Sequence, residues 1–211
     1  LKISFQFALM NEKADIVIVG AGTAGVYFGW LMIRKGYSVI ILEKESKKNM
    51  ANRLDIFHFD SIKFEEFGIP LPEESSPELI AVHEIGHAHS PNGKLSKPVK
   101  YGFHVMRLKP FLTRLQELAI EEGVEFKYSC NFIELDLENN EIKGVIAEKN
   151  GERFKINSKL IVDASGIDAV VRTSLPSNHG VESFKLAPDD VLYVILRYIK
   201  WSKPEEAHPE D

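Results

Sequence analysis

Short apolar segments alternate with polar ones along the chain, and their lengths indicate a mixture of strands and helices. Residues 14–19 and 37–42 are rich in β-branched side chains, which is typical of buried parallel strands. Between them, residues 23–35 carry apolar side chains at helical spacing, and Gly36 follows where a helix often ends. The pattern predicts a βαβ unit, and its crossover should be right-handed.

The rest of the chain continues this alternation and ends in a charged tail. After the βαβ unit, the pattern predicts a surface loop at 43–52, a short helix at 57–67, and strands at 80–89 and 98–105 joined by the Pro91-Asn92-Gly93 turn. An amphipathic helix at 108–122 follows, and then a hairpin of strands 132–137 and 142–148 and a turn at Asn150-Gly151. The last predicted elements are a buried strand at 160–162, a helix at 169–175 and a strand at 190–201. These elements indicate an α/β fold. We expect a Rossmann-like parallel sheet, β-hairpins and the start of an antiparallel sheet.

A glycine-rich turn joins the first strand to the first helix. Its residues are Gly20, Ala21, Gly22, Thr23, Ala24 and Gly25, a GxGxxG motif. In such a turn Gly20 permits the tight bend, Gly22 lets a pyrophosphate approach the backbone, and Gly25 allows close packing of the helix on the sheet. The free N–H groups at the helix N-terminus attract phosphate. The turn therefore predicts a dinucleotide site.

An acidic residue, Glu43, stands at the end of the second strand, followed by Lys44. Its carboxylate can accept hydrogen bonds from ribose hydroxyls, and it would repel a 2′-phosphate. This disfavours NADP in the pocket. The turn and the acid together leave FAD and NAD open, because both contain ADP.

Composition and charge narrow the alternatives. The formal net charge of −5 and the lack of a basic stripe with aromatic residues disfavour a nucleic-acid partner. The single cysteine, Cys130, excludes an internal disulfide, fits a cytoplasmic location, and is expected to be a buried structural thiol. No apolar run reaches the ~18 residues of a membrane span. Residues 1–9 are too short for a signal peptide, and Met10 resembles a natural start.

No set of catalytic side chains stands out, and no metal site is predicted. His83, His87 and His89 have a spacing that could suit metal ligands, but no cysteine lies near them. We expect these histidines to lie on the surface or to face the cofactor. Ser165 does not belong to a GxSxG elbow.

Four features in order resemble the flavoprotein group of p-hydroxybenzoate hydroxylases and, more closely, geranylgeranyl reductases. They are the βαβ unit, Arg53 after the second strand, the Val105-Met106-Arg107 segment leading into a helix, and the Leu160–Gly166 segment LIVDASG with Arg172 behind it. The resemblance covers residues 14 to about 201. It implies that FAD is the dinucleotide.

The resemblance also implies roles for individual residues. Arg53 and Arg107 would lie along the FAD, Phe132 beside the adenine, and Asp163 and Gly166 in a second dinucleotide fingerprint. Each residue has a structural alternative. Arg53 could be a solvated loop charge, and Arg107 could extend to solvent from a strand end. Asp163 could cap a helix, and Phe132 could be a core residue.

From the resemblance we expect an N-terminal extension at 1–13, an FAD-binding domain at 14–178 with inserted strands at about 54–104, and the start of a substrate domain at 179–211. The relatives are about twice as long, so the chain is expected to be an N-terminal portion or a truncated product. The implied function is an FAD-dependent oxidoreductase passing hydride to an organic or isoprenoid substrate, with NAD(P)H as a candidate reductant.

The alternatives are an FAD-dependent aromatic monooxygenase, an NAD-binding dehydrogenase and a non-catalytic nucleotide-binding fragment. The expected partner is a small or lipid-like substrate. Peripheral membrane contact and oligomeric state stay open.

Overall fold

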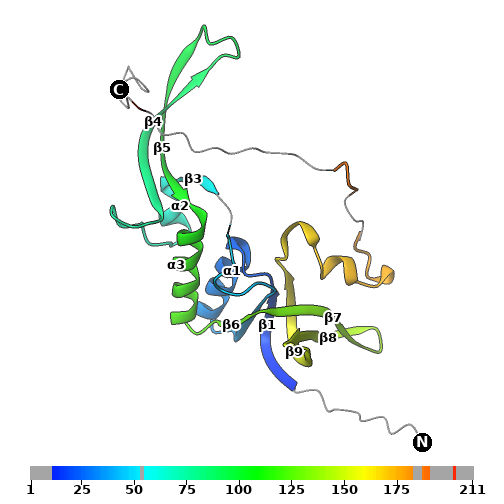
Figure 1. Cartoon of the computed structure of the whole chain (residues 1–211). Helices are drawn as coiled ribbons and strands as arrows, with labels where there is room; N and C mark the ends of the chain where they lie inside the picture. Colours follow the sequence, from blue (N-terminus) through cyan, green and yellow to red (C-terminus); the bar gives the residue numbers. More distant parts are fainter. Residues whose placement is uncertain (1–10, 53–54, 183–186, 191–201, 203–211) are drawn as a thin grey trace, which may run out of the picture.

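A computed structural model of the protein describes residues 11–52, 55–182, 187–190 and 202. Its centre is a βαβ unit made of β1 (Asn11–Val19), α1 (Thr23–Arg34) and β2 (Val39–Glu43). Strand β1 lies in the middle of a six-stranded sheet with the order β6-β2-β1-β9-β8-β7 (Figure 1). It pairs in parallel with β2 on one side and with β9 (Glu152–Asp163) on the other. The predicted strands at 14–19, 37–42 and 160–162 are thus neighbours in one parallel part of the sheet, and the expectation of a Rossmann-like parallel sheet is confirmed.

The sheet is parallel in one half and antiparallel in the other. Strand β6 (Glu125–Tyr128) extends the parallel part beyond β2. Strands β7 (Cys130–Glu138) and β8 (Glu141–Lys149) form an antiparallel meander with the first half of β9. The predicted turns lie at both corners of the meander, where Asn139, Asn140, Asn150 and Gly151 have positive φ.

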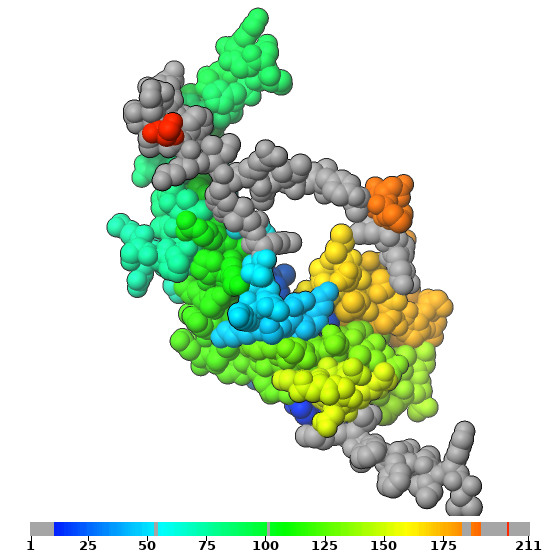
Figure 2. All heavy atoms as spheres, viewed as in Figure 1, coloured from blue at the N-terminus to red at the C-terminus, as the bar shows by residue number. Residues whose placement is uncertain are grey.

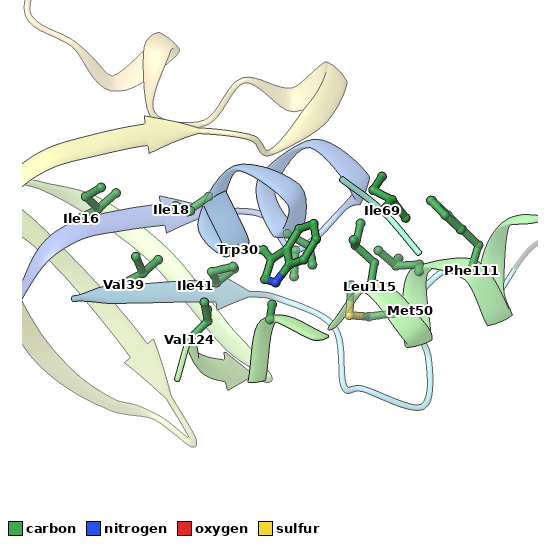
Figure 3. Packing of buried hydrophobic residues seen from close by; sticks show 14 of the residues in the cluster. Ile16, Ile18, Trp30, Val39, Ile41, Met50, Ile69, Phe111, Leu115 and Val124 are labelled. Carbon is green, nitrogen blue, oxygen red and sulfur yellow. The ribbon is translucent and has the colours of Figure 1, made fainter. Parts of the chain in front are cut away.

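Both faces of the parallel strands are buried, which explains their nearly continuous apolar sequences. On one face, α1 and α3 (Leu108–Glu121) cover the sheet, and Trp30 and Leu115 pack beside Ile18 and Ile41 (Figure 3). The other face of the parallel strands β1 and β2 packs against side chains of the meander. Gly36 follows α1 with positive φ, as the sequence predicted, and Gly123 follows α3 in the same conformation.

A second, antiparallel sheet contains β3 (Ile56–Asp60), β5 (Ser96–Arg107) and β4 (Leu79–His89), in the order β3-β5-β4. The prediction of one helix over 57–67 is wrong in its first half, because Phe57 and Phe59 alternate in β3 and pack against Phe111. Only α2 (Ser61–Glu66) is helical, and it begins after Asp60, whose carboxylate accepts a hydrogen bond from the N–H of Ile62.

After β9 the chain forms three short 3₁₀ turns, η1 (Gly166–Asp168), η2 (Arg172–Ser174) and η3 (Ser177–His179). The predicted α-helix at 169–175 is therefore wrong, since Ala169 has a left-handed conformation and Pro176 ends the segment. The predicted strand at 190–201 lies outside the described residues except for Asp190. Within the described part of the chain, no helix is both long and apolar enough to span a bilayer.

Candidate dinucleotide site

The carboxyl ends of β1, β2 and β9 meet at one edge of the sheet and surround a pocket of about 360 Å³. Four segments line it, namely the turn at Gly20 and Gly22, the end of β2 at Leu42–Lys44, the start of β7 at Cys130–Phe132, and the segment 164–170 after β9. The edge beyond the carboxyl ends of parallel strands is where α/β sheets bind their ligands.

The three glycines of the turn have different surroundings. Gly20 has φ +107°, and a Cβ there would lie 2.3 Å from the carbonyl oxygen of Ala164. A Cβ on Gly25 would lie 2.1 Å from the carbonyl oxygen of Gly20. These two glycines are required for packing. A Cβ on Gly22 would meet no protein atom within 4 Å, so this glycine borders open space at the pocket.

Gly22 is also the N-cap of α1, and it provides no side-chain hydrogen bond to the helix. The first-turn N–H groups, which belong to Thr23, Ala24 and Gly25, therefore have no capping side chain. Together with the open space at Gly22, this arrangement suits an anionic group.

Glu43 lies in the pocket wall and is only 9% exposed. One of its carboxylate oxygens accepts a hydrogen bond from the N–H of Ala21 (2.9 Å), and the other accepts one from the N–H of Glu45 (2.8 Å). The side chain thus fastens the glycine-rich turn to the end of β2. Its contact with a ribose stays a prediction.

An ion pair crosses the edge of the pocket. The Lys44 ammonium donates a hydrogen bond to the Asp168 carboxylate at 3.0 Å, and this bond raises the pKa of Lys44. Both residues line the pocket, one from the end of β2 and one from η1. Lys44 was predicted from the sequence, whereas Asp168 was missed as a pocket residue, because 124 positions separate them.

The second fingerprint divides into lining and supporting residues. Gly166 lines the pocket, together with Ser165, which was not predicted as a site residue. Asp163 is not among the lining residues. Its carboxylate accepts hydrogen bonds from Ser165 and from the N–H of Arg172 (2.7 Å). Burial alone would raise the pKa of Asp163, but these hydrogen bonds outweigh it, and the pKa lies below its usual value. Asp163 therefore holds the segment after β9 in place, and its part in a dinucleotide fingerprint stays a prediction.

Phe132 lines the pocket next to Cys130. Cys130 is buried as expected, and burial raises the pKa of its thiol. The role of Phe132 beside an adenine stays a prediction.

Of the two predicted arginines, the structure describes only Arg107, which is not among the residues that line the pocket. Arg53 lies outside the described residues. The Arg107 guanidinium donates hydrogen bonds to the backbone carbonyls of Pro77 (2.9 Å) and Leu79 (3.5 Å). The backbone N–H of Arg107 donates to the backbone carbonyl of Glu78. Arg107 therefore holds the segment before β4, and the structure does not bring it to the cleft at Gly22. A direct contact of Arg107 with the cofactor stays a prediction.

The histidines of the HxxxHxH segment lie on β4. His83 packs against Phe103, and the rings of His87 and His89 stack with centroids 6.2 Å apart. Among the residues that the structure describes, no cluster of three histidine, cysteine or acidic side chains could hold a metal ion.

Comparison with known families gives a match over residues 13–208 to the family described as FAD binding domain. The chain belongs to this family. Two curated relatives of this FAD-binding chain are digeranylgeranylglycerophospholipid reductases. The one from Methanocella arvoryzae is 25% identical over 168 residues, and the one from Methanopyrus kandleri is 28% identical over 173 residues. The matches cover 77% and 80% of this chain but 41% and 42% of the relatives, so the chain spans about two fifths of their length.

Solved structures agree on the fold. A geranylgeranyl bacteriochlorophyll reductase-like protein from Thermoplasma acidophilum has a TM-score of 0.70 at 18% identity, covering 84% of this chain and 44% of that protein. A flavin-dependent brominase has a TM-score of 0.60 at 22% identity, covering 73% of this chain and 38% of the other. The expectation of a Rossmann-like FAD-binding fold is confirmed.

The residues present fit the ADP part of FAD. Gly22 opens onto the pocket beside the uncapped start of α1, which suits a pyrophosphate. The Glu43 carboxylate is at the end of β2, where a ribose would be recognised. FAD, rather than NAD, is thus the dinucleotide of this FAD-binding domain.

Proposed function

We propose that this chain holds FAD for an oxidoreductase that saturates carbon–carbon double bonds of an isoprenoid lipid. The observation that carries the proposal is the pocket, in which Gly22 and Glu43 meet the segment 164–166, which lies more than 100 residues further along the chain. Relatives that are named as reductases of a digeranylgeranyl lipid support the choice of substrate class.

The chain's own residues position the cofactor. The start of α1 would bind the pyrophosphate, Glu43 the adenosine ribose, and Phe132 the adenine. Glu43 disfavours a 2′-phosphate at this position, so NADPH would act only as a transient electron donor and not as the resident dinucleotide. Bound FAD would supply the hydride chemistry, so the reaction does not require the set of catalytic acid and base side chains that the sequence lacks. A cytoplasmic location is part of the proposal.

Titration of the 211-residue chain tests the binding step. FAD should bind one to one with quenched flavin fluorescence and a visible absorption band, whereas NADP⁺ should leave the protein unchanged. Tighter binding of NAD⁺ than of FAD would favour the dehydrogenase alternative and contradict the proposal.

Turnover is tested separately. The FAD-loaded chain is reduced chemically under argon and mixed with a geranylgeranylated glycerophospholipid. Recovery of oxidised flavin together with a more saturated lipid, measured by mass spectrometry, is the expected result. In a second sample that is exposed to air, incorporation of an oxygen atom into the substrate would favour the monooxygenase alternative. FAD binding without either reaction would favour the alternative that this chain is a non-catalytic nucleotide-binding fragment.

A further inference from the structure

Strands β4 and β5 extend well beyond the third strand of their sheet. Strand β3 pairs with β5 only over residues 103–107, whereas pairing of β4 with β5 continues to His89 and Ser96. The distal part forms a two-stranded ribbon that projects away from the α/β body (Figures 1 and 2). We call residues 85–100 the hairpin arm.

The charge of the hairpin arm is opposite to that of the whole chain. It contains Lys94, Lys97 and Lys100 and no aspartate or glutamate, while the chain carries a formal charge of −5. The arm therefore presents a local positive charge on an acidic protein, and an anionic partner is the one that its charge fits.

Apolar side chains accompany the lysines. Leu95 is 74% exposed, Ile85 is 51% exposed and Val99 is 43% exposed. Leu95 lies in the turn, directly after Lys94. A protruding leucine beside a lysine is costly in water and favourable at the boundary between lipid headgroups and acyl chains.

Backbone hydrogen bonds fix the tip of the arm. The carbonyl of Leu95 accepts a hydrogen bond from the N–H of Ser90 (2.9 Å), and the N–H of Leu95 donates to the Ser90 hydroxyl (3.0 Å). The Asn92 side chain accepts from the Ser90 hydroxyl and from the N–H of Lys94. The tip is thus closed by its own polar groups, which frees the Leu95 side chain for contact with a partner.

Protection of the strand edge and binding of nucleic acid would each account for only part of this arrangement. Lysines and Pro98 on an unpaired strand edge prevent aggregation, but that role does not require an exposed leucine at the tip. Single-stranded nucleic acid needs aromatic platforms, and the arm contains no phenylalanine, tyrosine or tryptophan. An anionic lipid surface satisfies both the charge and the apolar tip.

We propose that the hairpin arm docks this protein on an anionic lipid surface. Leu95 enters the headgroup region, and Lys94, Lys97 and Lys100 contact the lipid phosphates. Docking of this kind is separate from FAD binding, and it can hold or fail independently of the reductase assignment.

Vesicle sedimentation tests the docking. The chain should bind vesicles of phosphatidylglycerol and phosphatidylcholine and should bind phosphatidylcholine vesicles much more weakly. A lysine near an anionic membrane contributes about fivefold to partitioning, so the variant K94Q/K97Q/K100Q should partition about a hundredfold less. Leu95→Ser should lower binding about tenfold, since it removes one inserted side chain.

A matched control removes three exposed lysines elsewhere, in the variant K35Q/K47Q/K48Q. The fold-decrease in vesicle partitioning of this control should be less than a tenth of that of the arm variant. Every variant should bind FAD as the parent does, which shows that its fold is intact. Equal losses in the two triple variants, or no binding of the parent to anionic vesicles, would overturn the proposal. Binding of a nucleic acid, or self-association, that depends on the arm lysines without vesicle binding would also overturn it.

Discussion

Replacing Gly22 and Gly25 in turn by alanine should separate the two tasks of the glycine-rich turn, ligand approach and packing. Gly22 has φ −71° and ψ 179°, which alanine can adopt, and its Cβ would meet no protein atom within 4 Å. A loss of about 0.5–1 kcal/mol from the N-cap preference is roughly offset by the reduced entropy of the unfolded chain. We therefore expect the free energy of unfolding of Gly22→Ala to stay within about 1 kcal/mol of the parent.

The same methyl group should be harmful to the ligand, because it fills the space through which a pyrophosphate approaches the start of α1. Losing one charged hydrogen bond to phosphate weakens binding by about 1.5–3 kcal/mol, which is about 10- to 150-fold in the Kd for FAD. Isothermal titration with FAD and urea denaturation of the same preparation give the two quantities.

Gly25→Ala provides the contrast. Its Cβ would lie 2.1 Å from the carbonyl oxygen of Gly20 and 3.1 Å from the Cβ of Ala164, so the helix must move away from the turn. Overpacking of this kind costs about 1–3 kcal/mol or more, and the loss should be visible without any ligand. If Gly22→Ala bound FAD with an unchanged Kd, the turn would not be the phosphate site. If Gly25→Ala were as stable as the parent, the helix would not pack closely on the turn.

Further substitutions test the supporting residues. Glu43→Gln should lower the free energy of unfolding, measured in urea, by about 1–3 kcal/mol. Both carboxylate oxygens accept a hydrogen bond from a backbone N–H, and in glutamine an NH2 donor would face one of these N–H groups. A variant as stable as the parent would contradict the role of Glu43 in holding the turn. Lys44→Ala and Asp168→Ala should each weaken FAD binding modestly. A double-mutant cycle on the free energy of FAD binding should give a coupling of about 0.2–1 kcal/mol between the two residues, and this coupling should fall with added salt. Strictly additive effects would show that the ion pair does not shape the pocket. Arg107→Gln should lower stability by about 1 kcal/mol through the lost carbonyl hydrogen bonds, whereas a loss of FAD affinity far exceeding the loss of stability would restore its predicted contact with the cofactor. Asp163 has a folded pKa below its usual value, so its stabilising contribution is present above about pH 4 and is lost as the pH falls through the folded pKa. Asp163→Asn should accordingly flatten the acid limb of a stability–pH curve, and an unchanged limb would contradict this assignment.

The local sequence determined the βαβ unit and its turn, because their signals lie within a few residues of one another. The β-branched run of β1, the three glycines and the apolar run of β2 are contiguous, and each restricts its own backbone. The Asn-Gly turn at 150–151 and the glycines after α1 and α3 were predictable for the same reason. The glycine motif with Glu43 was sufficient to predict a dinucleotide, and the resemblance of later segments indicated FAD.

Contacts between distant segments required the tertiary structure. The pairing of Lys44 with Asp168 and the binding of Arg107 to the 77–79 backbone depend on which strands become neighbours, and no local pattern encodes that. The apolar alternation at 57–60 is too short to distinguish a strand from a helix, and pairing with β5 makes this segment a strand. Local propensities amount to a fraction of a kcal/mol per residue, so burial against a partner strand outweighs them. For this reason the sequence indicated which turn binds the nucleotide, while the fold decided which residues complete the pocket and which only support it.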